Sequence, residues 1–285
     1  MNVFITGAAG GLGRAMAVEC AKRGYNIVLT DCDEIHLVQI KNGLLRQYDI
    51  NIEIIVCDLT NKEDVDTLIK KIDFLNLKFD MMLNIAGIDN EGAFMSRKYD
   101  QIGDIVKVNV EATLHITYEI LNRRNTPFNI VFVSSLASQF PMPLKATYAA
   151  SKRFLFDFAL SLGVELKESK VSVLTLCPGG LATNPTVIEA IDAQGFFGKA
   201  TTNRLEIVSR KTIQKALRGD TVYFPGVLNN LFRIFNNLLP RQMVANLIHR
   251  RWVKSQAKWL NTNNQSMANM VKTPITQNLE TKGVI

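Results

Sequence analysis

The chain has 285 residues, of which 47% are hydrophobic and 21% charged, and its formal net charge is +7. This balance is typical of a globular protein with a sizeable core and excludes a largely disordered, collagenous or coiled-coil chain. No run of 18 or more apolar residues occurs, so the sequence predicts no membrane-spanning helix. The basic charge belongs to the C-terminal third, because residues 1–203 carry 20 Lys or Arg against 23 Asp or Glu, whereas residues 204–285 carry 13 against 3.

The start of the chain and its cysteines predict the compartment. A strand-like segment begins directly after the initiator Met, which leaves no room for a signal peptide. The cysteines are widely spaced with no C-x-x-C pair, so we expect reduced thiols rather than disulfides or zinc ligands at Cys20, Cys32, Cys57 and Cys177. We therefore expect a cytoplasmic protein, and the three scattered histidines predict no metal site.

Short apolar runs rich in Val and Ile alternate with helix-length segments over residues 2–225. The predicted strands are Val3–Ile5, Ile27–Thr30, Ile52–Cys57, Met81–Leu83, Ile130–Val133, Val171–Leu176 and Thr221–Phe224. The predicted helices cover residues 11–24, 33–48, 61–75, 102–123 and 147–168. Apolar strands that alternate with helices in this way indicate parallel strands covered on both faces. We therefore predict an α/β fold with a Rossmann-type, doubly wound parallel sheet of about seven strands.

After Pro225 the pattern changes to apolar residues at helical spacing, and Pro240 starts a second helix. We predict a catalytic domain over residues 1–225, a basic amphipathic helical hairpin over 226–260 packed on it, and a polar tail over 261–285. Three interpretations of the basic segment 228–260 stay open: a packed surface of the fold, an oligomer contact, or a contact with an anionic membrane surface. Nucleic acid is not an expected partner, because no recognised binding module accompanies the charge.

The first strand runs into a glycine-rich turn, residues 6–13, that is followed by a helix. Glycine allows a tight turn and a close approach to a pyrophosphate, and the helix N-terminus offers free N–H groups to the phosphates. Asp31 ends the second strand 18 residues after Gly13, where a carboxylate can accept both hydroxyls of an adenosine ribose and would repel a 2′-phosphate. The sequence therefore predicts a dinucleotide site that prefers NAD to NADP.

Tyr148 and Lys152 lie four residues apart in a predicted helix and therefore share one face. A phenol is a poor acid–base catalyst at neutral pH, and a neighbouring cation lowers its pKa by favouring the phenolate. Ser135 stands 13 residues before Tyr148, at the carboxyl end of the fifth predicted strand, where ligands bind in sheets of this kind. These three residues indicate an acid–base site.

The chain resembles a short-chain dehydrogenase/reductase of the single-domain type over residues 2 to about 225. The resemblance rests on seven elements in family order: T-G-x-x-x-G-x-G at residues 6–13, Asp58, the segment 84–87 (Asn-Ile-Ala-Gly), Asn109, Ser135, Y-x-x-x-K at 148–152, and Pro178-Gly179 with Thr183. One departure is Ile85, which stands where the family usually has a second Asn.

The resemblance implies a role for each matching residue. Tyr148 would be the general acid in reduction and the base in oxidation, Ser135 would hydrogen-bond the reacting oxygen, and Lys152 would hold the nicotinamide ribose and lower the pKa of Tyr148. Asn109 would bind a water that relays protons between Lys152 and solvent. The cofactor-binding residues would be Thr6, Gly7, Gly11, Leu12, Gly13, Asp31, Asp58, Leu59, Asn84, Ala86, Gly87, Tyr148, Lys152, Pro178, Gly179 and Thr183.

The expected substrate site lies between a loop at residues 184–202 and a wall at residues 136–144, both mostly apolar. This composition favours a hydrophobic alcohol or ketone over a sugar phosphate, although such residues are also apolar where a loop only packs on closure. The expected substrate contacts are Ser135, Gln139, Phe140, Tyr148, Phe196 and Phe197.

We therefore expect an NAD-dependent oxidoreductase that transfers hydride reversibly between nicotinamide and the carbonyl or secondary alcohol of a steroid-like, acyl or cyclic substrate. Family habit implies a homodimer or homotetramer. Two alternatives stay open: a non-catalytic NAD-binding regulator or scaffold, and an NADP-dependent 3-oxoacyl-type reductase. A sugar-nucleotide epimerase or dehydratase fits poorly, because its glycine spacing is usually T-G-x-x-G-x-x-G.

Overall fold

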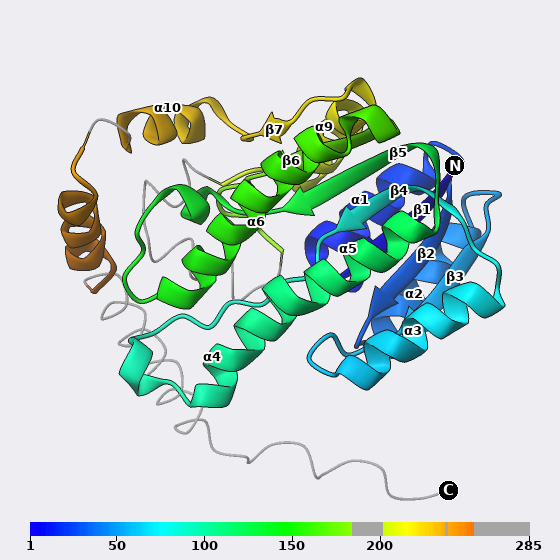
Figure 1. Cartoon of the computed structure of the whole chain (residues 1–285), viewed down its shortest axis with the longest axis horizontal. Helices are drawn as coiled ribbons and strands as arrows, with labels where there is room; N and C mark the ends of the chain where they lie inside the picture. The colour runs from blue at the N-terminus through cyan, green and yellow to red at the C-terminus, as the bar shows by residue number, and fades with distance from the viewer. Residues whose placement is uncertain (184–201, 237–238, 254–285) are drawn as a thin grey trace, which may run out of the picture.

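The fold is built on one seven-stranded, fully parallel sheet. The computed structural model describes residues 1–183, 202–236 and 239–253. The strand order is β3-β2-β1-β4-β5-β6-β7 (Figure 1). The strands are β1 (Asn2–Thr6), β2 (Asn26–Asp31), β3 (Ile52–Val56), β4 (Phe79–Asn84), β5 (Arg124–Val133), β6 (Val171–Leu176) and β7 (Val222–Tyr223). The predicted doubly wound α/β fold is thereby confirmed.

Helices connect successive strands and cover both faces of the sheet. They are α1 (Gly11–Ala21), α2 (Glu34–Leu45), α3 (Lys62–Phe74), α4 (Tyr99–Val106), α5 (Thr113–Asn122), α6 (Ala146–Glu165) and α9 (Leu205–Arg218). The single helix predicted over 102–123 is wrong in one respect, because a π-helical segment, Lys107–Ala112, separates α4 from α5. The π-helical segment contains Asn109, whose side chain forms hydrogen bonds with residues outside this helix.

Two hydrophobic cores lie on opposite faces of the sheet. Along β1, Val3 and Ile5 belong to one core and Phe4 to the other, since neighbouring side chains of a strand point to opposite faces. The first core packs against α1, α2 and α9, and the second packs against α3, α5 and α6. Figure 1 looks onto the second layer, with the sheet behind it. Burial on both faces explains why the strands are apolar throughout rather than alternating.

The winding direction reverses between β1 and β4. The chain proceeds outward from β1 through β2 to β3, then returns to β4 on the other side of β1 and continues to β7. The carboxyl ends of β1 and β4 are therefore adjacent while their following helices lie on opposite faces, which opens a crevice at that edge.

Two helices follow β7, as the predicted hairpin requires. They are α10 (Val227–Asn236) and a helix over residues 241–253. On the latter, Val244 is buried and Ile248 and Trp252 are half-buried. None of the described helices is both long enough and apolar enough to cross a membrane. The predicted tail at 261–285, the end of the extension at 254–260, and Phe196 and Phe197 lie outside the described residues.

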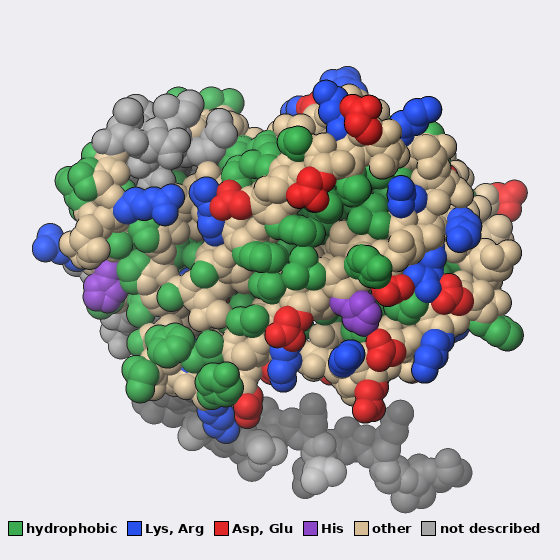
Figure 2. All heavy atoms as spheres, in the orientation of Figure 1, with side chains coloured by type: hydrophobic (Ala, Val, Ile, Leu, Met, Phe, Trp, Pro, Cys, Tyr) green, Lys and Arg blue, Asp and Glu red, His purple; other side chains and the backbone are tan. Residues whose placement is uncertain are grey.

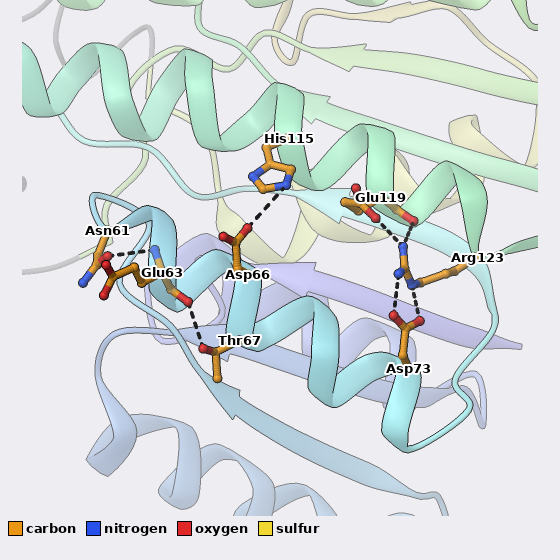
Figure 3. Close-up of polar contacts among 8 residues, drawn as sticks. All are labelled: Asn61, Glu63, Asp66, Thr67, Asp73, His115, Glu119 and Arg123. Atoms are coloured by element: carbon orange, nitrogen blue, oxygen red, sulfur yellow. Dashed lines mark hydrogen bonds and ion pairs between the residues drawn. The ribbon is translucent and has the colours of Figure 1, made fainter.

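A polar cluster joins α3 to α5 above the second core (Figure 3). The Arg123 guanidinium donates to both carboxylate oxygens of Asp73, Nε to Oδ1 and Nη2 to Oδ2, each at 2.6 Å, and its Nη1 donates to Glu119 Oε2 at 2.5 Å. About two turns away along both helices, His115 Nε2 lies 3.9 Å from Asp66 Oδ1. Arg123 therefore ties the end of α3 to the end of α5.

We predict that Arg123→Met lowers the thermal midpoint by about 2 °C at pH 7, because exposed ion pairs stabilise weakly. The guanidinium holds the pKa of Asp73 below its usual value. A carboxyl whose pKa is lowered by folding stabilises the protein above its unfolded pKa and ceases to do so as the pH falls through its folded pKa. The difference between variant and wild type should therefore fade below about pH 4. Thermal melts across this range measure it, and a difference that persists at pH 2 would contradict the account.

Candidate active site

A cleft of about 590 Å³ opens at the carboxyl ends of the strands, where the winding reverses. Most of the residues predicted from the sequence line it, although they come from distant parts of the chain. These residues are Gly7, Gly11, Leu12, Gly13, Asp31, Asp58, Leu59, Ala86, Gly87, Ser135, Tyr148, Lys152, Pro178, Gly179 and Thr183. Its volume falls within the range of ligand sites in proteins.

Two predicted cofactor residues, Thr6 and Asn84, are buried behind the cleft. The Thr6 hydroxyl accepts hydrogen bonds from the backbone N–H groups of Ile85 and Ala86, each at 3.1 Å, and donates to Asn84 Oδ1 at 3.2 Å. Thr6 therefore joins the turn after β1 to the turn after β4. Ile85 takes part through its backbone alone, which explains why an apolar side chain is accommodated there.

The glycine turn after β1 leaves no space for side chains. A Cβ at Gly7 would lie 2.7 Å from Ala86 Cα, and one at Gly13 would lie 2.1 Å from the Gly7 carbonyl oxygen. Gly7 also has a φ of +65°, which favours glycine. The N-cap of α1, Gly10, supplies no side-chain bond to the first N–H groups of the helix. These groups line the cleft and could hold an anionic pyrophosphate.

Asp31 lies at the carboxyl end of β2, on the rim of the cleft. Its carboxylate accepts hydrogen bonds from the backbone N–H groups of Ala9, at 3.0 Å, and Asp33, at 3.2 Å. The turn after β1 therefore fixes the position of this charge. Cys32 and Cys57 line the same part of the cleft and were not among the predicted site residues.

Asn109 lies in the π-helical segment and is fully buried. Its Oδ1 accepts from the Ile88 N–H at 2.8 Å, and its Nδ2 donates to the Ile88 carbonyl and to Ser151 Oγ, each at 3.0 Å. The side chain thus connects the segment after β4 to α6, the helix of Tyr148 and Lys152. Asn109 holds these two segments together behind the cleft and does not line the cleft itself. Its role in a water relay stays a prediction.

Lys152 is almost completely buried, with 3% of its surface exposed. Its Nζ donates to the Val133 carbonyl at 2.9 Å. Burial lowers the pKa of this ammonium to about 8, although the negative charge of Asp89 raises it in part. A Cβ at Gly87 would lie 2.7 Å from the Lys152 Nζ, so glycine at this position provides the space that the ammonium occupies.

Tyr148 is half-buried, and the pKa of its phenol lies above the usual value. Burial is the main cause and the Asp89 carboxylate adds to it, whereas a hydrogen bond with Ser135 and the charge of Lys145 act in the opposite direction. The net direction is the reverse of the one expected from Lys152, whose Nζ lies 5.8 Å from the ring centroid. Ser135 also accepts from the Ala137 N–H at 3.1 Å, which fixes its hydroxyl.

Lys145 and Asp89 are site residues that the sequence motifs missed. The Lys145 ammonium pairs with Asp89 and, at 3.1 Å, with Glu91. It lies 5.6 Å from the centroid of the Tyr148 ring and 5.2 Å from that of Trp252. Burial opposes its charge, but the two carboxylates prevail and raise the pKa of Lys145. A basic residue three positions before Tyr148, on the same side of a helix, was the available signal.

Gln139 and Phe140, predicted to contact substrate, do not line this cleft. The structure places them on a second hollow of about 400 Å³, between the segment 138–143, α6 and the helix 241–253. A short 3₁₀ turn, Leu136–Gln139, follows Ser135 and carries the chain around to the other side of α6. The order of residues in the sequence does not reveal this change of direction, so it predicts residues 136–144 as one wall of the substrate site.

Known proteins share this sequence and architecture. The family model described as short chain dehydrogenase matches residues 1–190. The chain is 31% identical to 11-beta-hydroxysteroid dehydrogenase-like 3 of Arabidopsis thaliana over 197 residues, or 68% of this chain and 63% of the relative. It is 28% identical to the 3-oxoacyl-(acyl-carrier-protein) reductase of Rickettsia bellii over 187 residues, or 65% of this chain and 74% of the relative. The match to "Probable oxidoreductase EphD" of Mycobacterium tuberculosis covers 68% of this chain and 33% of that protein, so the chain spans about a third of its length.

A crystal structure of a 3-oxoacyl-(acyl-carrier protein) reductase with bound NAD from Brucella melitensis has a TM-score of 0.67 and 25% identity, covering 79% of this chain and 89% of that one. The family model covers more than half of the 285 residues, and all the cleft residues named above lie within it. The chain therefore belongs to the short-chain dehydrogenase family.

Proposed function

We propose that this protein is an NAD-dependent oxidoreductase that interconverts a secondary alcohol and a ketone on a mostly apolar substrate. The observation that carries the proposal is the meeting of Ser135, Tyr148 and Lys152 in the cleft that the glycine turn also lines. Members of the family bind NAD or NADP, and a reductase of similar structure holds NAD. A protein that only binds a dinucleotide has no need of the phenol and serine, which argues against a non-catalytic regulator.

Each side chain has a distinct task in the proposed reaction. Bound NAD(H) would supply or accept the hydride. Tyr148 donates its phenolic proton to the carbonyl oxygen in reduction and takes it back in oxidation. Ser135, already hydrogen-bonded to Tyr148, orients the same oxygen. The Lys152 ammonium would bind the ribose hydroxyls beside it, and the charge of Lys145 partly offsets the burial that raises the pKa of Tyr148.

Asp31 supports NAD rather than NADP as the cofactor. Its carboxylate is held at the end of β2 by two backbone N–H groups, and it faces the cleft from the rim. A 2′-phosphate at that position would meet a fixed negative charge, whereas the two ribose hydroxyls would find an acceptor.

The substrate class rests on the names of the relatives and on the apolar lining of the cleft. Relatives are named for 3-oxoacyl and hydroxysteroid substrates, which are ketones or secondary alcohols on apolar bodies. Ile85, Ile88 and Leu181 line the cleft beside the polar groups. A 3-oxoacyl-type reductase is the second candidate, favoured by the Rickettsia and Brucella relatives.

We also propose the organisation expected from the sequence: a catalytic domain over residues 1–225, the helical extension 226–260 and the tail 261–285. The four cysteines are free thiols, three of them buried, which supports a cytoplasmic location. A homodimer or homotetramer stays the expected assembly.

Tyr148→Phe should reduce turnover about a thousandfold, because it removes the proton donor while keeping the ring. NADH binding, followed by cofactor fluorescence, should change little. Tyr223→Phe is the matched control, since Tyr223 lies on β7 and does not line the cleft. Assays over acyl, steroid and cyclic ketones measure the loss, and full turnover by Tyr148→Phe would refute the role.

Asp31→Asn should shift the ratio of NADPH to NADH dissociation constants about tenfold in favour of NADPH. The amide oxygen can still accept the Ala9 N–H bond, so the change removes the charge and one of the two backbone hydrogen bonds, that from the Asp33 N–H. Asp33→Asn, two residues further on and exposed, is the control. An unchanged ratio in both variants would show that Asp31 does not select the cofactor.

Lys152→Met should raise the free energy of unfolding by about 3 kcal/mol at pH 7, although it abolishes turnover. The pKa of the Lys152 ammonium is about 8 in the folded protein and about 10.4 in the unfolded chain. Burial of the charge therefore destabilises the folded protein at neutral pH. Between these values the unfolded chain binds more protons, and wild-type stability rises with pH toward that of the variant.

Urea titrations from pH 7 to about pH 10 measure this convergence. Lys107→Met, at an exposed lysine, should show little change over the same range. A Lys152→Met protein less stable than wild type at pH 7 would contradict the prediction.

A further inference from the structure

The helix 241–253 has apolar side chains on two sides. Val244, Ile248 and Trp252 recur every four residues and turn inward, and the ring of Trp252 lies 5.2 Å from the Lys145 Nζ. Met243 and Leu247 are also four residues apart, but each is 50% exposed. Packing on the domain therefore uses one side of this helix and leaves a second apolar side in solvent.

Arg250 and Arg251 flank the exposed apolar side, and Arg241 stands in the first turn of the helix, beside the inner hollow. Arg241, Arg250 and Arg251 lie on the same helix and are exposed, and Arg250 falls three positions after Leu247, on the outer side. No Asp or Glu occurs between residues 221 and 279. We define the C-terminal patch as Leu239, Arg241, Met243, Leu247, Arg250 and Arg251. Apolar and basic side chains lie together on the edge of the molecule where this helix is placed in Figure 1 (Figure 2).

A hollow extends from the patch into the protein. It has a volume of about 400 Å³ and lies between this helix and α6. Phe140, Pro141 and Met142 form its apolar wall, and Arg153 and Arg241 contribute the two cationic groups. An apolar space beside guanidinium groups suits a molecule with an anionic head and a hydrocarbon chain.

We propose that the C-terminal patch docks the protein on an anionic membrane surface. Met243 and Leu247 enter the boundary between headgroups and acyl chains, while Arg241 and Arg250 contact lipid phosphates. A second copy of the chain fits less well, because a two-fold contact would bring two basic, acid-free patches together. Nucleic acid fits less well because the centre of the patch is apolar.

Docking has a consequence for the cleft. The inner side of the same helix contacts Lys145, which lies over the Tyr148 ring, so docking would place this helix between the lipid and the acid–base residue. This consequence rests on the proposed function, whereas the docking itself does not.

Co-sedimentation of the full chain with lipid vesicles tests the docking without an activity assay. Wild type should bind vesicles of phosphatidylcholine with phosphatidylglycerol and bind pure phosphatidylcholine far less. Met243→Glu with Leu247→Glu should weaken binding at least about tenfold, because it removes the inserting groups and adds repelling charge. The control is Phe74→Glu with Val164→Glu, which makes the same change of charge at residues 88% and 77% exposed on α3 and α6.

A second variant separates charge from insertion. Arg241→Gln with Arg250→Gln should weaken binding to phosphatidylglycerol vesicles about twenty-five-fold, at about fivefold for each arginine, and should flatten the salt dependence. Circular dichroism confirms that each variant is folded. The proposal is overturned if wild type does not sediment with anionic vesicles at low salt, or if the glutamate pair in the patch binds as well as the control pair. Dimerisation through the patch without vesicle binding would also overturn it, in favour of a second copy.

Discussion

The close approach of two turns, one after β1 and one after β4, is the constraint on which the site depends. Gly7 lies so near Ala86 that a Cβ would be 2.7 Å from its Cα, and the Thr6 hydroxyl accepts two N–H bonds from the facing turn. Because both strands are parallel and adjacent, their carboxyl ends lie side by side, and the crevice opens between them because the winding reverses there. The glycines therefore serve the packing of the protein on itself as much as the approach of a ligand.

The same end of the sheet buries a charge that the fold does not need. Lys152 donates one hydrogen bond to a carbonyl, yet it pairs with no carboxylate in the part of the chain that the structure describes, and burial lowers its pKa to about 8. Such a group destabilises a folded protein at neutral pH and is expected where chemistry requires it. Two residues hold this buried charge in place. Asn109 fixes the backbone behind the site, and Gly87 leaves space for the ammonium.

The sequence was sufficient to predict the sheet and most of the cleft, because both depend on local patterns. Strand ends follow from the chain order and predict Asp31 and Ser135 at one edge of the sheet, whereas Thr183 follows only from the family resemblance. Contacts between distant loops leave no such pattern. Phe140 was misplaced because a 3₁₀ turn redirects the chain after Ser135, and Asp89 was missed because its pairing with Lys145 joins segments 56 residues apart.

The missed pair changes how the charge around Tyr148 should be understood. Two lysines lie near this phenol, and burial opposes the charge of both, but the net direction of the pKa shift differs between them. Among the described residues Lys152 forms no ion pair, and the distant charge of Asp89 does not prevent its pKa from falling, whereas Asp89 and Glu91 pair with Lys145 and raise its pKa. Lys145 is also the residue on which the ring of Trp252 lies. The position of the helix 241–253 is therefore coupled to the electrostatics of the acid–base residue, and whatever holds that helix in place also acts on the site.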